Sequence, residues 1–373
     1  MQVARPTDDE RTRLLGQFAC VRIVQTNRMD LSLFDFDRDL TFAAFFLNPT
    51  DRTIYGRYGT RSGDAGKADS TLAGFAAAMR GALALHAKYP AEKAALAAKT
   101  GPAPRAKVPE DLRELSRYST VADFSNLNER SCIHCHQVGR AEALELRAAA
   151  TPMSDAVLFP WPMPDALGLG LANDRCGTVT HVAPDSAAAR AGFIVGDEIE
   201  RLAGQPILSV ADVQWVLHRA TEPASIPATV ARGGKTVELS LKLASGWRRS
   251  SSPSWRMVDR HLSLADLTRL GLGSVSLRPV SATDRGKLGV EPDHLALEVG
   301  RSRGRGRRGE AGGQPAAGGL EAGDILVAFD GLTTAMTEMD VLAHCVQKRK
   351  AGDEVPATVI RAGSKVELQL RLR

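Results

Sequence analysis

The sequence lacks any apolar run long enough to cross a membrane as a helix, which takes roughly 20 residues. The nearest candidate, TLAGFAAAMRGALALHAKY, is interrupted by Arg80 and is predicted to be an alanine-rich helix of a globular domain. The opening residues, MQVARPTDDERTRLL, also lack the apolar core of a secretory signal peptide. Taken literally, both absences predict a cytoplasmic protein without a membrane span.

Cysteine is scarce as well. Five cysteines in 373 residues exclude a disulfide scaffold, and a chain of this length is expected to form about two to four domains. Only Cys132 and Cys135 are spaced to act together. Cys20 falls in CVRIV, a predicted strand, where a lone cysteine is expected to be a small buried hydrophobe.

Evenly spread positive charge is also missing. The net charge is +5, but five arginines lie in the single run GRSRGRGRRGE, and without that run the chain is near neutral. No aromatic residue interrupts the run to stack on bases. We therefore predict a solvated Arg/Gly-rich insert at 301–317 and no nucleic-acid partner.

The C-terminal half contains an internal repeat. PATVARGGKTVELSLKL returns as PATVIRAGSKVELQLRL, and AGFIVGDEIERLAG is matched by GGLEAGDILVAFDG. Between these blocks, each copy has a helix start of the S/T-x-x-D form, Ser209 with Asp212 and Thr337 with Asp340. The last segment of each copy alternates apolar and polar residues, which is typical of half-buried strands.

The two copies, headed by LGLGL and LGLG, resemble the PDZ domain, and GTVTHVAPDSAAARAGFIVGDEIERLAGQPI is similar to the kind found beside bacterial trypsin-like proteases. The resemblance implies that each domain binds the C-terminus of a protein or peptide, which adds as a strand beside the capped helix. The first groove is favoured because the insert is expected to distort the second. The implied peptide-binding residues are Leu167, Gly168, Leu169 and Gly170 in the first copy, and Leu270, Gly271, Leu272 and Gly273 in the second.

Proteolysis is not predicted for the chain itself. No Gly-x-Ser-Gly-Gly-like nucleophile turn occurs, and the few histidines lack a matching sequence context.

The N-terminal segment has a different pattern. TFAAFFLNPTDRTIYGRYG is predicted to be a hairpin, followed by a helix with Ser70 as its N-cap. This order resembles the C-terminal part of a thioredoxin-like fold, although Leu40 stands where such folds keep a cis-proline. The usual first strand and Cys-x-x-Cys helix do not precede it, so we expect either a late gene start or a lost active half.

The motif SCIHCHQ has several possible chemical interpretations. Cys-x-x-Cys-His is typical of covalent haem attachment, with thioethers at Cys132 and Cys135 and His136 as the axial ligand to the metal. Zinc, a redox dithiol and a structural role are the alternatives. Haem attachment would require an extracytoplasmic, for example periplasmic, location, which conflicts with the missing signal peptide.

Taken together, FDFDRDLTFAAFF, CIHCHQV and VQWVLHR are similar to blocks of the bacterial thioredoxin-like/PDZ-domain (seleno)protein family, whose biochemical activity is not firmly known. We expect a multi-domain α+β protein. Its predicted parts are a partial thioredoxin-like domain at 1–100, a helical CxxCH linker at 101–164, and PDZ domains at 165–246 and 260–373.

The function predicted from the sequence is peptide binding coupled to a redox centre, most simply haem c, with an electron-transfer partner. The alternatives are a non-catalytic scaffold with structural or zinc-binding cysteines, and a thiol oxidoreductase truncated at its N-terminus.

Overall fold

The computed structural model describes residues 9–61, 70–118, 132–175, 177–249, 264–273, 275–301 and 317–373. Two compact units divide the chain, one formed by Met1–Val138 with Phe159–Arg256 and the other by Gly139–Leu158 with Met257–Arg373. Most of the predicted Arg/Gly loop, 302–316, lies outside the described residues. None of the helices in the described ranges has the length and apolar character of a membrane span.

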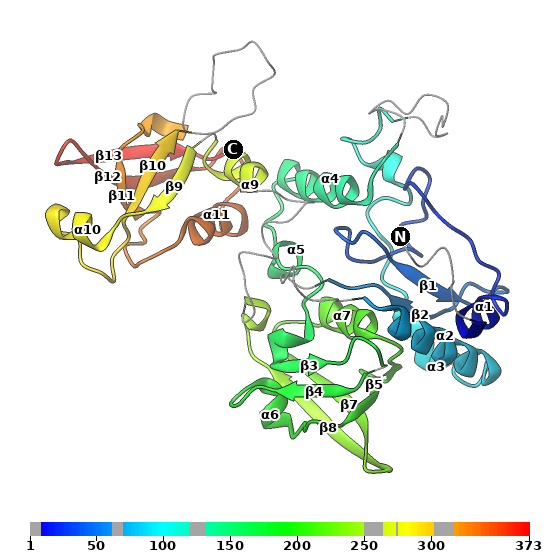
Figure 1. Ribbon diagram of the computed structural model, residues 1–373. Coiled ribbons are helices and arrows are strands. Elements are labelled where there is room, and N and C mark those ends of the chain that lie inside the picture. The colour runs from blue at the N-terminus through cyan, green and yellow to red at the C-terminus, as the bar shows by residue number, and fades with distance from the viewer. Residues whose placement is uncertain are drawn as a thin grey trace. The chain divides into compact units, whose positions relative to one another are not determined.

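The N-terminal part of the first unit is a hairpin covered by a helix (Figure 1). Strands β1 (Ala44–Leu47) and β2 (Ile54–Tyr58) pair antiparallel, and α2 (Leu72–Ala87) packs on them through a cluster that includes Phe46, Phe75 and Met79. The predicted hairpin and helix are therefore confirmed. The smaller helices of this part are α1 (Asp9–Leu15), α3 (Lys93–Leu96), η2 (Ala97–Lys99) and η3 (Pro109–Asp111).

Two details of this part differ from the prediction. The N-cap of α2 is Thr71, whose hydroxyl accepts from Gly74 N–H at 3.0 Å, and not Ser70. The predicted strand CVRIV is wrong, since Val21 is 87% exposed and Cys20 is exposed rather than buried. A β-branched run becomes a strand only beside a partner, and β1 and β2 pair solely with each other among the described residues.

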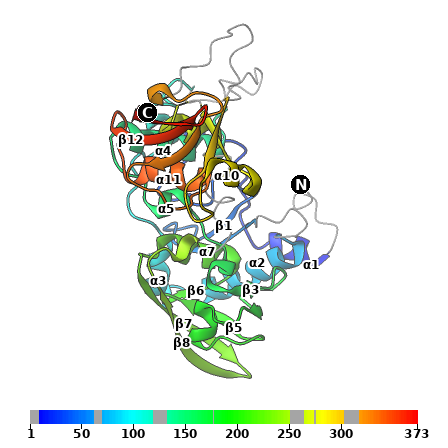
Figure 2. The ribbon, with the colours of Figure 1, turned by 90° about the vertical axis from the view of Figure 1, so that its left-hand side faces the viewer.

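The rest of the first unit consists of two small antiparallel sheets, ordered β3-β4 and β6-β5-β7-β8. The long β7–β8 hairpin extends from one end of this unit (Figure 2). Leu241 and Leu243 of the alternating final strand face a core that also holds Val213, Val216 and Leu217. The elements of this part are, in chain order, η4 (Pro164–Leu167), β3 (Leu169–Leu171), β4 (Val179–Val182), α6 (Ala187–Ala191), β5 (Glu198–Leu202), β6 (Gln205–Pro206), α7 (Val210–Arg219), β7 (Ala224–Arg232), β8 (Lys235–Leu243) and η5 (Trp247–Arg249).

The second unit contains one antiparallel sheet in the order β13-β12-β11-β10-β9. Its strands and helices follow the order of those from β3 to β8, with α10 added between the first two strands, η6 in the place of α6 and, among the described residues, no counterpart of β6. Helix α4 (Cys135–Ala148) enters this unit from Gly139 onward. The other elements are α5 (Asp155–Leu158), α9 (Leu264–Gly271), β9 (Val275–Pro279), α10 (Ala282–Leu288), β10 (Leu297–Arg301), η6 (Ala317–Gly319), β11 (Ile325–Phe329), α11 (Glu338–Gln347), β12 (Glu354–Arg361) and β13 (Ser364–Arg371).

Arg147 of α4 joins three separate backbone positions of the second unit. Its guanidinium donates to the carbonyl oxygens of Cys345, Arg349 and Arg373, at distances between 2.6 and 3.2 Å. The side chain therefore ties α4 to the end of α11, to Arg349 just after it and to Arg373, two residues beyond β13.

Candidate peptide-binding site

The predicted carboxylate loop of the first unit is a tight turn between η4 and β3. Gly168 has φ +80°, and a Cβ there would lie 2.2 Å from the Cβ of Ser186, so only glycine fits without displacement. Gly168 N–H donates to Asp165 O at 2.9 Å, and Gly168 O accepts from Ala183 N–H at 2.8 Å. These bonds set the position at which β3 begins.

Strand β3 has one edge that no strand covers among the described residues. On its other edge, Leu169 is opposite Val182 and Gly170 is opposite His181 of β4. Bonded and non-bonded residues alternate in an antiparallel pair, and Gly168 is bonded to β4. The N–H and C=O groups of Leu169 therefore point to the uncovered edge, where an added strand would bind them.

Residues that follow β3 and the first residues of α7 line one hollow, so we take α7 as the other wall of a groove beside β3. Ser209 caps its first turn by accepting from Ala211 N–H at 3.0 Å, as the sequence predicted. Every residue from Val210 to Leu217 is buried. Because Val213, Val216 and Leu217 already fill the domain core, burial of the remaining positions must come from other parts of the chain.

Other parts of the chain cover α7 on two faces, and one of these faces carries Gln214 and His218. Thr60 Oγ1 donates to Gln214 Oε1 at 2.5 Å, and Gln214 Nε2 donates to Trp161 O at 2.9 Å. The Trp161 ring stacks on the His218 imidazole with 4.6 Å between centroids. Burial, together with the nearby charge of Arg248, lowers the pKa of His218 to about 3, so the neutral ring accepts from Trp161 N–H at 3.4 Å.

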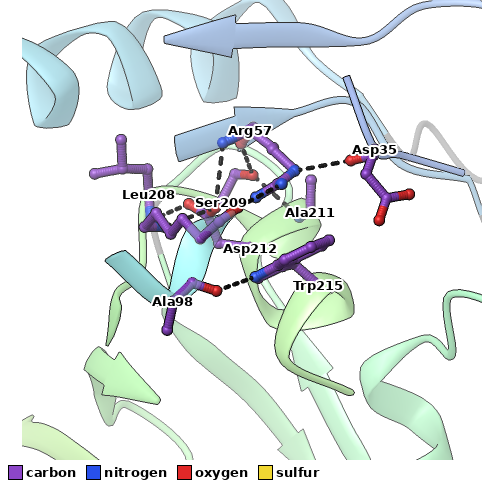
Figure 3. A network of polar contacts seen from close by, with 9 residues as sticks. Asp35, Arg57, Ala98, Leu208, Ser209, Ala211, Asp212 and Trp215 are labelled. Atoms are coloured by element: carbon purple, nitrogen blue, oxygen red, sulfur yellow. Dashed lines mark hydrogen bonds and ion pairs between the residues drawn. The ribbon is translucent and has the colours of Figure 1, made fainter. Parts of the chain in front are cut away.

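The other covered face carries a buried ion pair (Figure 3). Lys99 Nζ lies 2.8 Å from Asp212 Oδ1, and the side chains are 0% and 1% exposed. The same carboxylate accepts from Leu208 N–H at 2.9 Å and from Arg57 N–H at 3.2 Å. Asp212, which the sequence pattern marked only as part of a helix start, thus connects α7 to β2 and η2.

Arg57 completes this network. Its guanidinium carbon lies 3.9 Å from the centre of the Trp215 ring, and Nε donates to Asp35 O at 3.1 Å. Burial lowers the pKa of Arg57 to about 10 and also lowers the pKa of Lys99. Both shifts are opposed by the charge of Asp212, so one carboxylate compensates two buried cations.

The end of β3 is also covered. Thr71 Oγ1 donates to Asn173 O at 2.9 Å, and a Cβ on Gly74 would lie 2.2 Å from that oxygen. A small hollow, partly open to solvent, lies between this contact and the start of α7. Tyr58, Gly59 and Ala172 line it together with the first residues of α7.

In the second unit, the predicted loop residues are divided between a helix and a turn. Leu270 and Gly271 form the end of α9, and a Cβ on Gly271 would lie 3.1 Å from Cys345 Cβ of α11. Leu272 is buried, and Gly273 has φ +80°, the value found at Gly168. Gly273 thus stands two residues before β9, whereas Gly168 stands directly before β3.

The edge of β9 that no strand of the described ranges covers is bound by a side chain of its own unit. Leu277 N–H donates to Glu338 Oε1, at the start of α11, at 2.8 Å. A peptide that added to β9 would have to displace this carboxylate.

The CxxCH motif is held by Ile133, the residue that follows its first cysteine. Ile133 is fully buried, its N–H donates to Asn27 Oδ1 at 2.8 Å, and its carbonyl oxygen accepts from the hydroxyl and the N–H of Thr26 at 2.7 and 3.0 Å. The loop therefore fastens the start of α4 to the N-terminal part of the unit.

The cysteines and histidines of the motif are the residues predicted to hold haem or zinc or to act as a dithiol. Burial raises the pKa of Cys135, which favours the thiol over the reactive thiolate. The rings of His134 and His136 stack face to face with 5.7 Å between centroids. Cys132 is half-buried, and no group of three or more His, Cys, Asp or Glu side chains that could hold a metal occurs in the described part of the chain.

Comparison with known proteins identifies the class of domain that contains the first groove. Residues 165–243 match the family of the PDZ domain, so the chain carries a PDZ domain at this position. A curated relative, the "Probable periplasmic serine endoprotease DegP-like" of Marinomonas sp. (strain MWYL1), is 26% identical over 198 residues, which are 53% of this chain and 37% of the relative. The chain thus spans well under half the length of the curated protein it matches.

Solved structures of similar proteins include two bacterial proteases. The serine endoprotease from Yersinia pestis is 23% identical, with 21% of this chain and 28% of that chain covered and a TM-score of 0.19. An HtrA-type protease, AlgW, determined with a decapeptide, is 15% identical, with coverages of 41% and 50% and a TM-score of 0.22.

The curated relative overturns the redox function predicted from the sequence. The curated relative is named a serine endoprotease, and the prediction of peptide binding coupled to a haem redox centre is therefore wrong. Cys-x-x-Cys-His is short enough to occur without haem, and here burial of Ile133 gives the loop an anchoring role.

Proposed function

We propose that this chain binds extended peptide segments through its PDZ domain, by adding them as a strand to the uncovered edge of β3. The orientation of Leu169 carries the proposal, because its backbone N–H and C=O groups point away from β4. The loop from Leu167 to Gly170 would receive the terminal carboxylate of the peptide. The side chains of Leu167 and Leu169 are buried in the domain core, which leaves backbone groups as the main contact.

The remaining architecture is proposed from element order. A second PDZ domain at 260–373, with Leu272 and Gly273 before β9, is supported by the succession of strands and helices that it shares with the first. The partial thioredoxin-like domain at 1–100 is supported by the hairpin β1–β2 and the helix α2 packed on it. The CxxCH linker would then occupy 101–164.

Peptide binding can be tested on the full chain with a pool of fluorescent decapeptides that carry free carboxyl termini. We expect saturable binding, weakened when the same peptides carry a C-terminal amide or when alternate peptide nitrogens are methylated, since methylation removes strand-forming donors. Hydrogen exchange should slow at 169–171 when peptide is added. Binding that is unaffected by both modifications, or protection elsewhere only, would refute addition to β3.

A second candidate is a role in proteolysis, favoured by the similarity to a serine endoprotease. In the second unit, His344 Nε2 lies 2.6 Å from Asp330 Oδ2, but Arg349 binds the same carboxylate. No serine hydroxyl completes this pair among the described residues. Labelling of the full chain by a fluorophosphonate probe would support catalysis, and absence of labelling beside a labelled serine protease would count against it.

A further inference from the structure

The end of β2 and the residues that follow it run along the PDZ helix. Ser209 Oγ donates to Arg57 O at 2.6 Å at the start of α7, and Thr60 Oγ1 donates to Gln214 Oε1 further along the helix. Thr60 Oγ1 also lies 3.3 Å from Met163 Sδ, on the segment that enters η4. Residues 57–61, here called the strap, thus extend beside α7 toward the carboxylate loop.

The strap uses polar groups of α7 that a peptide would otherwise meet. Both ends of the Gln214 amide are occupied from within the chain, the oxygen by Thr60 and the nitrogen by Trp161 O. Gln214 is only 2% exposed. A peptide that approached this part of α7 would have to replace both hydrogen bonds or leave a buried amide unsatisfied.

The cover continues on the side of β3. After the strap, the start of α2 reaches the end of β3, where Thr71 donates to Asn173 O and Gly74 lies against the same oxygen. The N-terminal segment therefore contacts α7 through the strap and, through Thr71, the residues just after β3. The ion pair between Lys99 and Asp212 holds the N-terminal segment on the other covered face of α7.

We propose that the strap is an autoinhibitory element, so that the PDZ groove binds peptide only when residues 57–61 leave α7. This inference rests on the proposed function, since it concerns regulation of the same groove. The measured dissociation constant is then the intrinsic one divided by the fraction of molecules with an open groove. Weakening the strap raises that fraction and tightens apparent binding.

The test compares Thr60→Val with wild-type full-length chain, using the pool of free-carboxyl decapeptides. Removing one hydrogen bond of ordinary strength is expected to tighten apparent binding about fivefold. Thr60→Ser keeps the hydroxyl and should bind like the wild type. Thr229→Val removes a hydroxyl that bonds Glu238 on the β7–β8 hairpin, away from the strap, and should also leave affinity unchanged.

Hydrogen exchange supplies a second readout on the wild-type chain. Peptide should slow exchange at 169–171 and speed exchange at 57–61, because binding and strap release occur together. If peptide protects 169–171 while Thr60→Val binds with wild-type affinity, the strap proposal is refuted and peptide binding stands. If no variant binds any peptide of the pool, peptide binding fails and the strap proposal fails with it. If the two readouts disagree, the ratio of the dissociation constants of Thr60→Val and wild type decides the test.

Discussion

The buried pair of Lys99 and Asp212 should contribute more to stability than any exposed ion pair of the chain. Lys99→Met keeps most of the side-chain volume but leaves the Asp212 carboxylate without its closest cation, at a position that is 1% exposed. Removing one partner of a buried pair costs about 3–5 kcal/mol of unfolding free energy. Two backbone N–H groups still bind this carboxylate, so we expect the lower end of that range.

The assay is urea denaturation of the full chain, followed by tryptophan fluorescence. Trp215 is a suitable reporter because it is fully buried and its indole N–H donates to Ala98 O at 2.9 Å, next to Lys99. Lys93→Met is the matched control, since Lys93 also makes a 2.8 Å ion pair, with Asp51, but its side chain is 60% exposed. Screened surface pairs contribute little, and the control should shift the midpoint far less.

The double variant Lys99→Met/Asp212→Asn separates the pair from its surroundings. Once the carboxylate is neutral, losing the ammonium should cost less, and we expect the two changes to be non-additive by at least about 1 kcal/mol. Equal midpoints for Lys99→Met and Lys93→Met, or strict additivity in the double variant, would show that this pair does not hold the N-terminal segment to α7.

Three further outcomes follow from particular contacts. His218 has its pKa lowered from 6.5 to about 3, so below pH 6.5 the unfolded chain takes up a proton that the folded chain does not. The first unit should lose about 2 kcal/mol between pH 6.5 and 5 from this group, and His218→Phe should flatten that dependence in urea titrations. Gly74→Ala should destabilise by about 1–3 kcal/mol because its Cβ meets a backbone oxygen, whereas Gly81→Ala meets only the movable end of Leu208 and should cost less in thermal unfolding. Arg147→Leu should speed hydrogen exchange at the end of α11, and Arg147→Lys should restore only part of the protection, since lysine lacks the planar fork.

Local patterns in the sequence were reliable where neighbouring residues decide the structure. The caps at Ser209 and Thr337 were visible as S/T-x-x-D patterns because a cap is formed by residues a few positions apart. The hairpin β1–β2 and the alternating strands β8 and β13 were predicted for the same reason. CVRIV failed because pairing needs a partner strand that no local pattern reveals.

The CxxCH motif led to the redox function that the similarity to a serine endoprotease contradicts. Its spacing favoured haem, zinc or a dithiol, but the chemistry of a thiol depends on surroundings brought in from other parts of the chain. Burial raises the pKa of Cys135, and Ile133, a position that no motif marks, is bound by Thr26 and Asn27 from more than a hundred residues earlier.

The sequence by itself determined the PDZ domain, its glycine turn at Gly168 and the helix that forms one wall of its groove, because these features depend on short-range backbone geometry and on a repeating apolar pattern. Only the tertiary structure decided that this groove is covered. Lys99, Thr60 and Asp212 carry no shared motif, and they meet because burying a charge or an amide requires a partner wherever the fold supplies one. Such partners are set by packing between distant segments, and the sequence pattern alone does not reveal them.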